Sequence, residues 1–280
     1  MTRLVPTEEL AYITMLQRFG IPYTPRAHST LNQFLNILPT ANIPVGKYPV
    51  SRYIVFGNGG HANGSGPGPT IYDHAANYKG LYNLLPIVLR PLNNDLTPME
   101  REGVALRAIV SINNVDYVAY YALRIDGLAL TPTQEIRQID PDTNELVFSS
   151  NYVPVSSEQT PPKPSIGGEV STTNKYIGTF LTYELHLNSF FIAEFAKACQ
   201  IIYGSTDNAI ISEIGYVSGI DKIIQITEHD GATQNDFTEA IACVITGYMA
   251  YYSLVKPPST DLRITTEISV SMPLINLNPV

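Results

Sequence analysis

The tract from Gly57 to Pro69, which reads GNGGHANGSGPGP, most constrains the structures open to this chain. Glycine admits positive φ angles and proline removes a backbone donor, so the tract cannot continue a helix or a sheet ladder. It predicts a surface loop, a flexible arm or a strap that a partner orders. A phosphate cradle is the functional alternative, because glycine-rich turns can direct several N–H groups at an anion. We disfavour the cradle because no Lys-Ser/Thr pair follows Gly66 and the prolines behind it exclude a helix.

Two further stretches are rich in proline. Residues Ile21 to Pro49 hold five prolines, with apolar residues such as Leu31 and Ile37 between them. Prolines at this density favour an extended, partly polyproline-like path, while the apolar residues need a surface to contact. An arm lying across a neighbouring subunit meets both conditions. The stretch from Val153 to Gly168 holds four more prolines and predicts a linker or long loop.

Apolar residues at helical spacing predict three helices. The first begins after Thr7, a capping residue followed by two carboxylates, and ends at Gly20. The second runs from about Ser189 to Tyr203 and has Gly204 as its stop signal. The third runs from Asp236, the first residue of a capping-box pair, through Tyr252.

Alternating apolar and polar residues predict strands elsewhere in the chain. Ala105 to Ile112 and Val115 to Ile125 flank the two-residue turn Asn113-Asn114 and predict a β-hairpin. Thr131 to Phe148 predicts a second strand pair around a turn at residues 141–144. The other predicted strands are Leu84 to Leu89, Ile177 to Leu187, Ala209 to Val217, Ile223 to Thr227 and Leu262 to Met272.

Strands and helices mix in this prediction without a strict βαβ rhythm, which favours the α+β class. We expect a mixed, mostly antiparallel sheet packed against two or three helices, with long Pro/Gly-rich arms and loops. Residues 1–69 are expected to form an N-terminal helix, an extended arm and the Gly-rich loop. Residues 70–280 are expected to form the α+β body, interrupted by a Pro-rich loop at about 153–168.

The composition favours a protein that contacts other protein surfaces. Of 280 residues, 44% are hydrophobic and only 15% are charged, so a sizeable core can form beneath a surface poor in charge. Eighteen tyrosines strengthen this interpretation, because tyrosine is enriched where proteins meet. For any single tyrosine, a half-buried strand position is the simpler explanation. The formal net charge of −8, without a cluster of Lys or Arg, disfavours a nucleic-acid-binding face. An acidic surface also fits the lining of a passage through which DNA slides, because charge repulsion prevents the DNA from sticking.

The sequence predicts no catalytic, cofactor-binding or metal-binding residue. The five histidines show none of the zinc-site spacings, and His61 and His74 beside Asp73 are better explained as loop residues than as ligands. Cys199 and Cys243 lie in apolar contexts and predict buried free thiols, which fit a reducing compartment. Neither a signal peptide nor an apolar stretch of membrane-spanning length is expected.

Charged residues near predicted turns have two interpretations each. Asp140, Asp142, Glu145, Glu228 and Asp230 are explained by turn chemistry, although a pair of glycosidase carboxylates would look similar in sequence. Arginines and acids around the hairpin predict either ion pairs between subunits or a solvated surface. These residues are Arg101, Arg107 and Arg124 with Glu100, Glu102 and Asp126.

Four stretches carry a resemblance to known proteins: Phe56 to His61, Arg90 to Leu96, Asp116 to Tyr121 and Ile210 to Ile214. Together they resemble uncharacterised virion structural proteins of tailed bacteriophages, especially those with contractile tails. The resemblance implies a place in the particle, in a ring at the neck, tail or baseplate whose arms and loops cross to the next subunit. It carries over no catalytic residues.

We therefore expect a non-enzymatic structural subunit of a bacteriophage virion, forming a ring as a neck or tail-completion (head–tail connector) component. A baseplate or capsid-associated virion protein is one alternative, and a glycan- or receptor-binding module is another. The expected partners are further copies in a homo-oligomeric ring and other virion proteins, without sequence-specific nucleic acid binding and without a membrane. The expected location is the virion, assembled in the host cytoplasm. A soluble enzyme would instead need a deep pocket with titrating groups of shifted pKa.

Overall fold

The computed structural model describes residues 4–62, 68–125, 130–143, 145–159, 169–227, 231–255 and 261–278. The chain divides into two compact units. The first unit comprises Met1–Gly127 and Leu185–Ile264, and the second comprises Leu128–Glu184 and Thr265–Val280. Two long strands, β11 (Glu169–Leu187) and β14 (Leu262–Asn278), belong partly to each.

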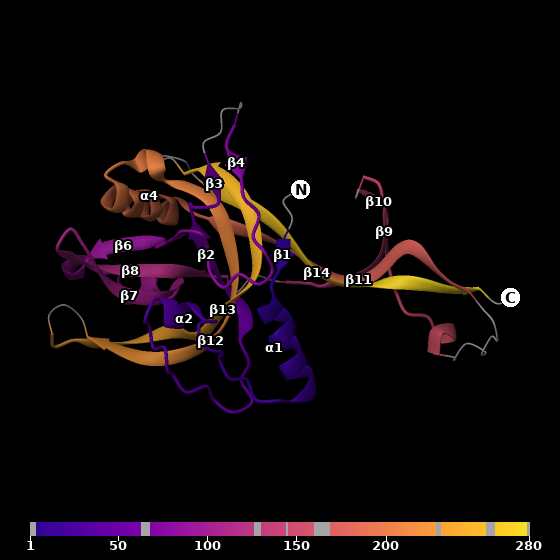
Figure 1. The fold of residues 1–280 in the computed structure, drawn as a ribbon. Helices are drawn as coiled ribbons and strands as arrows, with labels where there is room; N and C mark the ends of the chain where they lie inside the picture. The colour runs from indigo at the N-terminus through magenta and orange to yellow at the C-terminus, as the bar shows by residue number, and fades with distance from the viewer. Residues whose placement is uncertain are drawn as a thin grey trace. The chain divides into compact units, whose positions relative to one another are not determined.

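The first unit is built on an eight-stranded sheet whose described pairings are all antiparallel (Figure 1). Its strands follow the order β1 (Leu4–Pro6), β13 (Gln234–Leu254), β12 (Ile210–Thr227), β2 (Val50–Gly57), β8 (Val115–Arg124) and β6 (Val88–Pro91). In addition, β5 (Leu84–Leu85) pairs with β2, and β7 (Val104–Ile112) pairs with β8. The long hairpin of β12 and β13 therefore forms one side of the sheet and the hairpin of β7 and β8 the other.

Two helices of more than one turn pack on this sheet. α1 (Glu8–Phe19) buries Ile13 and Leu16 against β13, and α4 (Ser189–Tyr203) buries Ala198 against β6 and β8. The remaining described helices are short: α2 (Leu31–Phe34), α3 (Pro98–Arg101), η1 (Leu92–Asn94), η2 (Ser156–Gln159) and η3 (Thr206–Asn208). None of the helices in the described ranges is long and apolar enough to span a membrane.

The predicted α+β class, with a sheet packed against two or three helices, is wrong. Strands hold about half of the described residues and helices about a fifth, so the fold is a mostly antiparallel β structure. Among the described elements only α1 and α4 exceed one turn, and the core lies mainly between strands. The largest single cause of the error is the stretch from Asp236 to Tyr252, which was predicted as a helix and lies in strand β13.

β13 is a strand because it pairs with β12 along most of its length, from Ile210 opposite Leu254 to Thr227 opposite Gln234. The residues from Ala240 to Met249 are buried without interruption. A strand covered on both faces loses the alternation that distinguishes it from a buried helix. Three shifts of register between β12 and β13 further disturb the alternation, and Ala242 adopts φ 53° beside one of them.

The proline-rich stretch from Ile21 to Pro49 contacts its own chain. Leu31 and Ile37 lie in the core of the first unit, with 1% and 7% of their surface exposed. Asn32 donates to Ala240 O over 2.8 Å and accepts from Cys243 N over 2.8 Å, so it satisfies backbone groups at the irregular part of β13. For Leu31 and Ile37, the expectation of a contact with a neighbouring subunit is therefore wrong.

The predicted hairpin turn and the two glycine stop signals are confirmed, whereas Thr7 stands at the N-cap of α1 but its hydroxyl donates to Ile245 O and does not cap the helix. Asn113 and Asn114 adopt φ 52° and 62° between β7 and β8, as a two-residue hairpin turn requires. Helices α1 and α4 end at glycines in the left-handed region, Gly20 and Gly204. The strand predicted at Leu84 to Leu89 is interrupted and forms β5 and β6 instead.

Replacing Gly204 with alanine is expected to lower the free energy of unfolding by about 1–2 kcal/mol. Gly204 has φ 76°, a conformation that strains any residue with a Cβ, although no atom lies within 4 Å of the added carbon. Urea unfolding would measure the loss. Gly80→Ala is the matched control, because Gly80 has the same open surroundings without a left-handed φ, and an equal loss in both variants would contradict the strain explanation.

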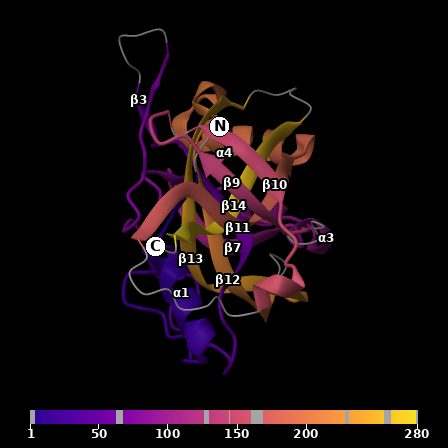
Figure 2. The ribbon, with the colours of Figure 1, turned by 90° about the vertical axis from the view of Figure 1, so that its right-hand side faces the viewer.

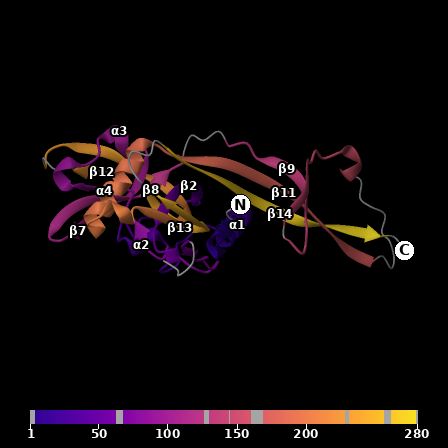
Figure 3. The same cartoon turned by 90° about the horizontal axis from the view of Figure 1, so that it is seen from above.

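The second unit is a four-stranded sheet in the order β10 (Leu146–Asn151), β9 (Thr133–Ile139), β11 and β14. Figures 2 and 3 show β11 and β14 side by side. The strand pair predicted within Thr131 to Phe148 is confirmed as β9 and β10. Of the predicted Pro-rich loop, residues 160–168 lie outside the described residues.

His61–Ala62, within the Gly-rich tract, form strand β3 and pair with β4 (Thr70–Ile71), so the prediction that the tract cannot take part in a sheet ladder is wrong at these two residues. The middle of that tract, residues 63–67, lies outside the described residues.

Candidate functional site

On one face of the second unit's sheet, polar side chains form hydrogen bonds with one another. Ser149 of β10, Arg137 of β9 and Tyr176 of β11 are cross-strand partners and share this face. Arg137 donates to both carboxylate oxygens of Glu267 over 2.7 and 2.8 Å and to Glu135 over 2.8 Å. Hydrogen bonds from Arg137 and then from Ser149 lower the pKa of Glu135 to about 2.

The opposite face of the same sheet carries apolar side chains among polar ones such as Gln138, Lys175 and Thr179. On β10, Phe148 and Ser150 are two positions apart and therefore point to the same face. Their partners on β9, Gln138 and Ile136, point to that face as well. Ser271 lies beside Gly178 on the polar face, so its neighbours Val270 and Met272 also point to the second face. We call Ile136, Phe148, Ile177, Val270 and Met272 the apolar face.

The apolar face has little core beneath it. Phe148, Val270 and Met272 have 47%, 69% and 63% of their surface exposed. Among the residues of the second unit whose side chains the structure describes, only Gly178, Phe180 and Thr266 are buried. A sheet normally covers one face with another layer, and exposed apolar side chains gathered on one face are typical of a protein contact. The apolar face is the candidate functional surface.

A second cluster lies inside the first unit, around the carboxylate of Glu213. Glu213 is fully buried on strand β12 and accepts from His74 Nε2 over 2.8 Å. It also accepts from the backbone N–H groups of Gly59, Tyr82 and Asn83 over 2.8 to 2.9 Å. Burial alone would raise the pKa of Glu213, but these hydrogen bonds outweigh it and hold the pKa below its ordinary value.

The Glu213 cluster is closed to solvent. The side chain of His74 is 1% exposed and stacks on Tyr248, with ring centroids 4.4 Å apart and planes at 9°. Tyr82 covers the same ring, with centroids 4.5 Å apart. We conclude that the cluster holds the loop from His74 to Asn83 on strand β12 and leaves no described opening for a substrate.

The Gly-rich tract begins on this cluster, and its glycines serve the interior. A Cβ on Gly57 would lie 2.4 Å from Glu213 Oε1 and 2.5 Å from Asn83 O, so a side chain does not fit. The N–H groups of Gly59 and Gly60 donate to Glu213 and to Ser212 Oγ. Both donors are therefore satisfied within the chain, which leaves neither for an anion and argues against a phosphate cradle at these positions.

The predicted histidine and cysteine residues have structural surroundings. His74 binds Glu213, while the ring of His61 lies 5.2 Å from that of Tyr252. In the part of the chain that the structure describes, no group of three or more His, Cys, Asp or Glu residues is placed to hold a metal ion. Cys199 and Cys243 are buried free thiols, as predicted, and burial raises the pKa of Cys199 to about 12.

The three arginines around the hairpin bind acids of their own chain. Arg101 and Arg107 donate to Asp95 over 2.9 and 3.0 Å, and Arg124 donates to Asp221 over 2.7 Å. The partners predicted from sequence were different: Glu100 forms a capping box with Thr97, and Asp126 lies outside the described residues. Both interpretations offered for these arginines are therefore wrong, because all three are bound inside the first unit.

The predicted turn acids behave as turn chemistry requires where they are described. Asp140 accepts from the N–H groups of Asp142 and Thr143 over 2.8 and 3.0 Å. Glu228 and Asp230 lie outside the described residues.

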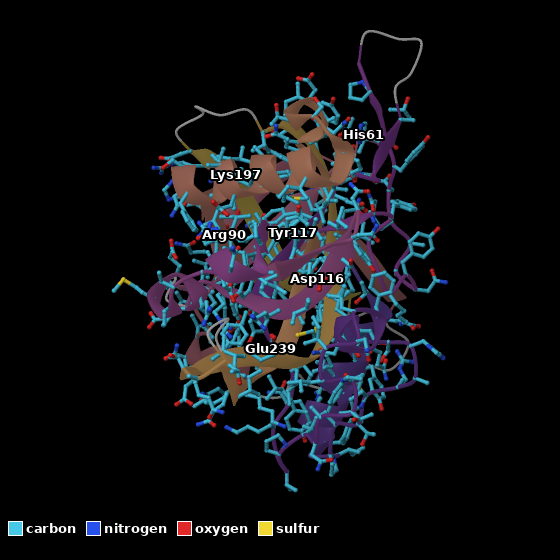
Figure 4. All side chains as sticks on the ribbon, turned by 90° about the vertical axis from the view of Figure 1, so that its left-hand side faces the viewer. His61, Arg90, Asp116, Tyr117, Lys197 and Glu239 are labelled. Carbon is cyan, nitrogen blue, oxygen red and sulfur yellow. The ribbon has the colours of Figure 1, made fainter. Side chains whose placement is uncertain are left out.

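A groove of about 470 Å³ lies between β6 and α4. Figure 4 labels two of its cationic residues, Arg90 and Lys197. Arg90 Nε and Lys197 Nζ donate to the buried Glu194 over 2.8 and 3.0 Å. The acid therefore offsets one of the two positive charges, and neither the charge nor the shape of the groove points to a particular ligand.

Sequence reasoning missed the acids that organise the first unit, which are Asp95, Glu194, Glu213 and Asp221, and treated Glu239 only as a helix cap. A signal existed for two of them. Glu213 and Glu239 are isolated carboxylates in runs of apolar residues, and a buried acid must find hydrogen-bond donors.

Comparisons with curated proteins and with solved structures find no significant match. A comparison with protein families finds a match over residues 2–280, almost the entire chain, which includes both units. The chain belongs to a family of unknown function, DUF7208.

Proposed function

We propose that this chain is a non-enzymatic structural subunit of a bacteriophage virion that forms a ring as a neck or tail-completion component. The observation that carries the self-assembly part of the proposal is the open apolar face of the second unit. The assignment to a virion has separate support, namely the resemblance of the stretches around Phe56, Arg90, Asp116 and Ile210 to phage structural proteins.

The size of the apolar face favours repeated contacts over a single strong one. Full burial of an exposed apolar side chain gains about 1.5–3 kcal/mol. Phe148, Val270 and Met272 expose only about half to two thirds of their surface, so each would gain roughly 1–2 kcal/mol. One such contact is weak compared with the cost of association. In a closed ring every subunit makes two contacts, which strengthens the assembly without a larger face.

The interior of the first unit supports a structural role over a catalytic one. The described acids Glu213, Glu239 and Asp95 bind backbone N–H groups, a histidine or arginines of the same chain. These contacts hold strands and loops together. A catalytic acid would need access to a substrate, and Glu213 and Glu239 lack it because they are buried.

The mass of the protein in solution tests self-assembly. We expect multiples of the 30.8 kDa chain mass by light scattering or native mass spectrometry. Val270→Asp is expected to give the 30.8 kDa monomer, because it places a charge on the apolar face. Val45→Asp is the matched control, since Val45 is a valine of the first unit with 96% of its surface exposed, and it should still assemble.

A wild-type chain that stays monomeric at all concentrations would overturn the assembly proposal. The virion assignment has its own test, which is quantitative mass spectrometry of purified particles. We expect a fixed copy number per particle that is consistent with a ring. Absence of the chain from infectious particles would contradict the assignment.

A further inference from the structure

β10 and β14 are the two outer strands of the second unit's sheet, no described strand pairs with their outer edges, and these edges have matching chemistry. β10 reads LVFSSN and carries no charge. The stretch of β14 from Ile268 to Met272 also carries no charge. Proteins that stay monomeric usually protect an outer strand with lysine, another charge or proline, because its free backbone groups can pair with another strand. Pro273 limits the stretch of β14 that could pair but leaves the residues before it unprotected.

The exposed apolar side chains of β10 are consistent with an outer strand that pairs with a strand of another molecule. Leu146, Val147 and Phe148 are consecutive and have 54%, 62% and 47% of their surface exposed. The register of β10 with β9 shifts between Leu146 and Phe148. Leu146 lies opposite Ile139 and Phe148 opposite Gln138, so these two side chains are open on opposite faces of this edge. A strand added beside β10 would cover side chains on both faces at once.

The directions of β10 and β14 decide which partner fits. β10 runs antiparallel to β9, and β9 runs antiparallel to β11. β11 and β14 are also antiparallel, because Gly178 lies beside Ser271 while His186, further along β11, lies beside Asp261, which directly precedes β14. β10 and β14 therefore run in opposite directions. When one copy follows another by rotation about a ring axis, β10 of the first can meet β14 of the next as an antiparallel pair.

We propose that β10 of one copy pairs with β14 of the next, so that the sheets of the second units join edge to edge around a ring. This inference rests on the proposed function, because it specifies the contact through which the subunits assemble. Pairing of β10 with β10 around a two-fold axis would leave every β14 edge open. The head-to-tail pairing uses both edges with one type of contact, and the joined sheets place the apolar faces of neighbours side by side.

Disulfide formation between two separately purified variants tests the pairing. One variant carries Ser149→Cys on β10, and each of four others carries a single cysteine on β14, in place of Ser269, Val270, Ser271 or Met272. The variants are mixed, allowed to assemble and oxidised mildly. Ser149 points to the polar face, as do Ser269 and Ser271, and paired residues on one face bring their Cβ atoms within disulfide distance. We therefore expect mixed dimers on a non-reducing gel with a cysteine at 269 or 271 and at least tenfold less with one at 270 or 272.

Three controls keep the outcomes distinct. The wild-type chain, whose two cysteines are buried, should give no cross-link, and neither should Val45→Cys in the first unit when mixed with Ser149→Cys. Strong self-linking of Ser149→Cys alone, or equal linking at all four β14 positions, would overturn the strand pairing. An assembled wild-type protein without the alternating cross-links would also overturn it while leaving the proposed function standing. A monomeric wild-type protein would instead remove the proposed function itself.

Discussion

Replacing Glu213 with alanine is expected to lower the free energy of unfolding of the first unit by about 3–5 kcal/mol. The substitution removes the acceptor for His74 Nε2 and for the N–H groups of Gly59, Tyr82 and Asn83, all held within 2.9 Å. Those donors would stay buried without a partner. Urea unfolding followed by tyrosine fluorescence would measure the loss, because the chain contains no tryptophan.

Two comparisons isolate the charge of Glu213 from its shape. Glu213→Gln keeps the shape and removes the charge, and Glu145→Ala removes an exposed acid as a control expected to change stability by less than about 0.5 kcal/mol. Because folding lowers the pKa of Glu213 below its ordinary value of 4.5, its ionised form stabilises the folded state above that pH. The stability gap between wild type and Glu213→Gln should therefore be full near pH 7 and shrink as the pH falls below 4.5 through the lowered pKa. A loss below about 1 kcal/mol in Glu213→Ala would contradict this account.

Local signals in the sequence were sufficient where a turn or a cap decides the structure. The Asn113-Asn114 turn predicted the hairpin of β7 and β8, and Gly204 predicted the end of α4. They failed for β13, whose apolar residues are buried on both faces and therefore show no period of two. Whether such a run forms a helix or a strand depends on β12, its long-range partner, and the spacing of residues within the run does not reveal that partner.

The candidate site shows the same division between local pattern and tertiary context. The sequence predicted the alternation along Leu262 to Met272, and Val270 and Met272 indeed share one face. It did not predict that this face is open, because openness depends on whether another layer of the chain covers it. Similarly, the prolines of residues 21–49 predict an arm for another subunit, whereas Leu31 and Ile37 of this stretch lie in the core of the first unit.

Replacing Glu239 with alanine is the second substitution with a large expected effect, a loss of at least about 3 kcal/mol in the free energy of unfolding. Glu239 lies on β13 and is labelled in Figure 4. Its carboxylate accepts from Leu106 N and Arg107 N of β7 over 2.6 and 2.9 Å, and from Ala240 N over 2.7 Å. It thus joins β7 to β13, two strands that are not neighbours in the order of the sheet. Alanine would leave three N–H groups, two of them buried, without an acceptor and would separate the two hairpins along this edge.

The pH dependence at Glu239 should be opposite to that at Glu213. Burial raises the pKa of Glu239 above its ordinary value of 4.5, despite the opposing hydrogen bonds from Ala240, Arg107 and Leu106. The folded state therefore favours the protonated acid, and the contribution of this group to stability is full below pH 4.5 and declines as the pH rises through the raised pKa. Relative to Glu239→Gln, which does not titrate, wild type should lose stability between pH 4.5 and neutrality in urea unfolding. If wild type instead gained free energy of unfolding relative to Glu239→Gln over that range, the hydrogen bonds to β7 would outweigh burial. The pKa of Glu239 would then be lowered by folding, contrary to this account.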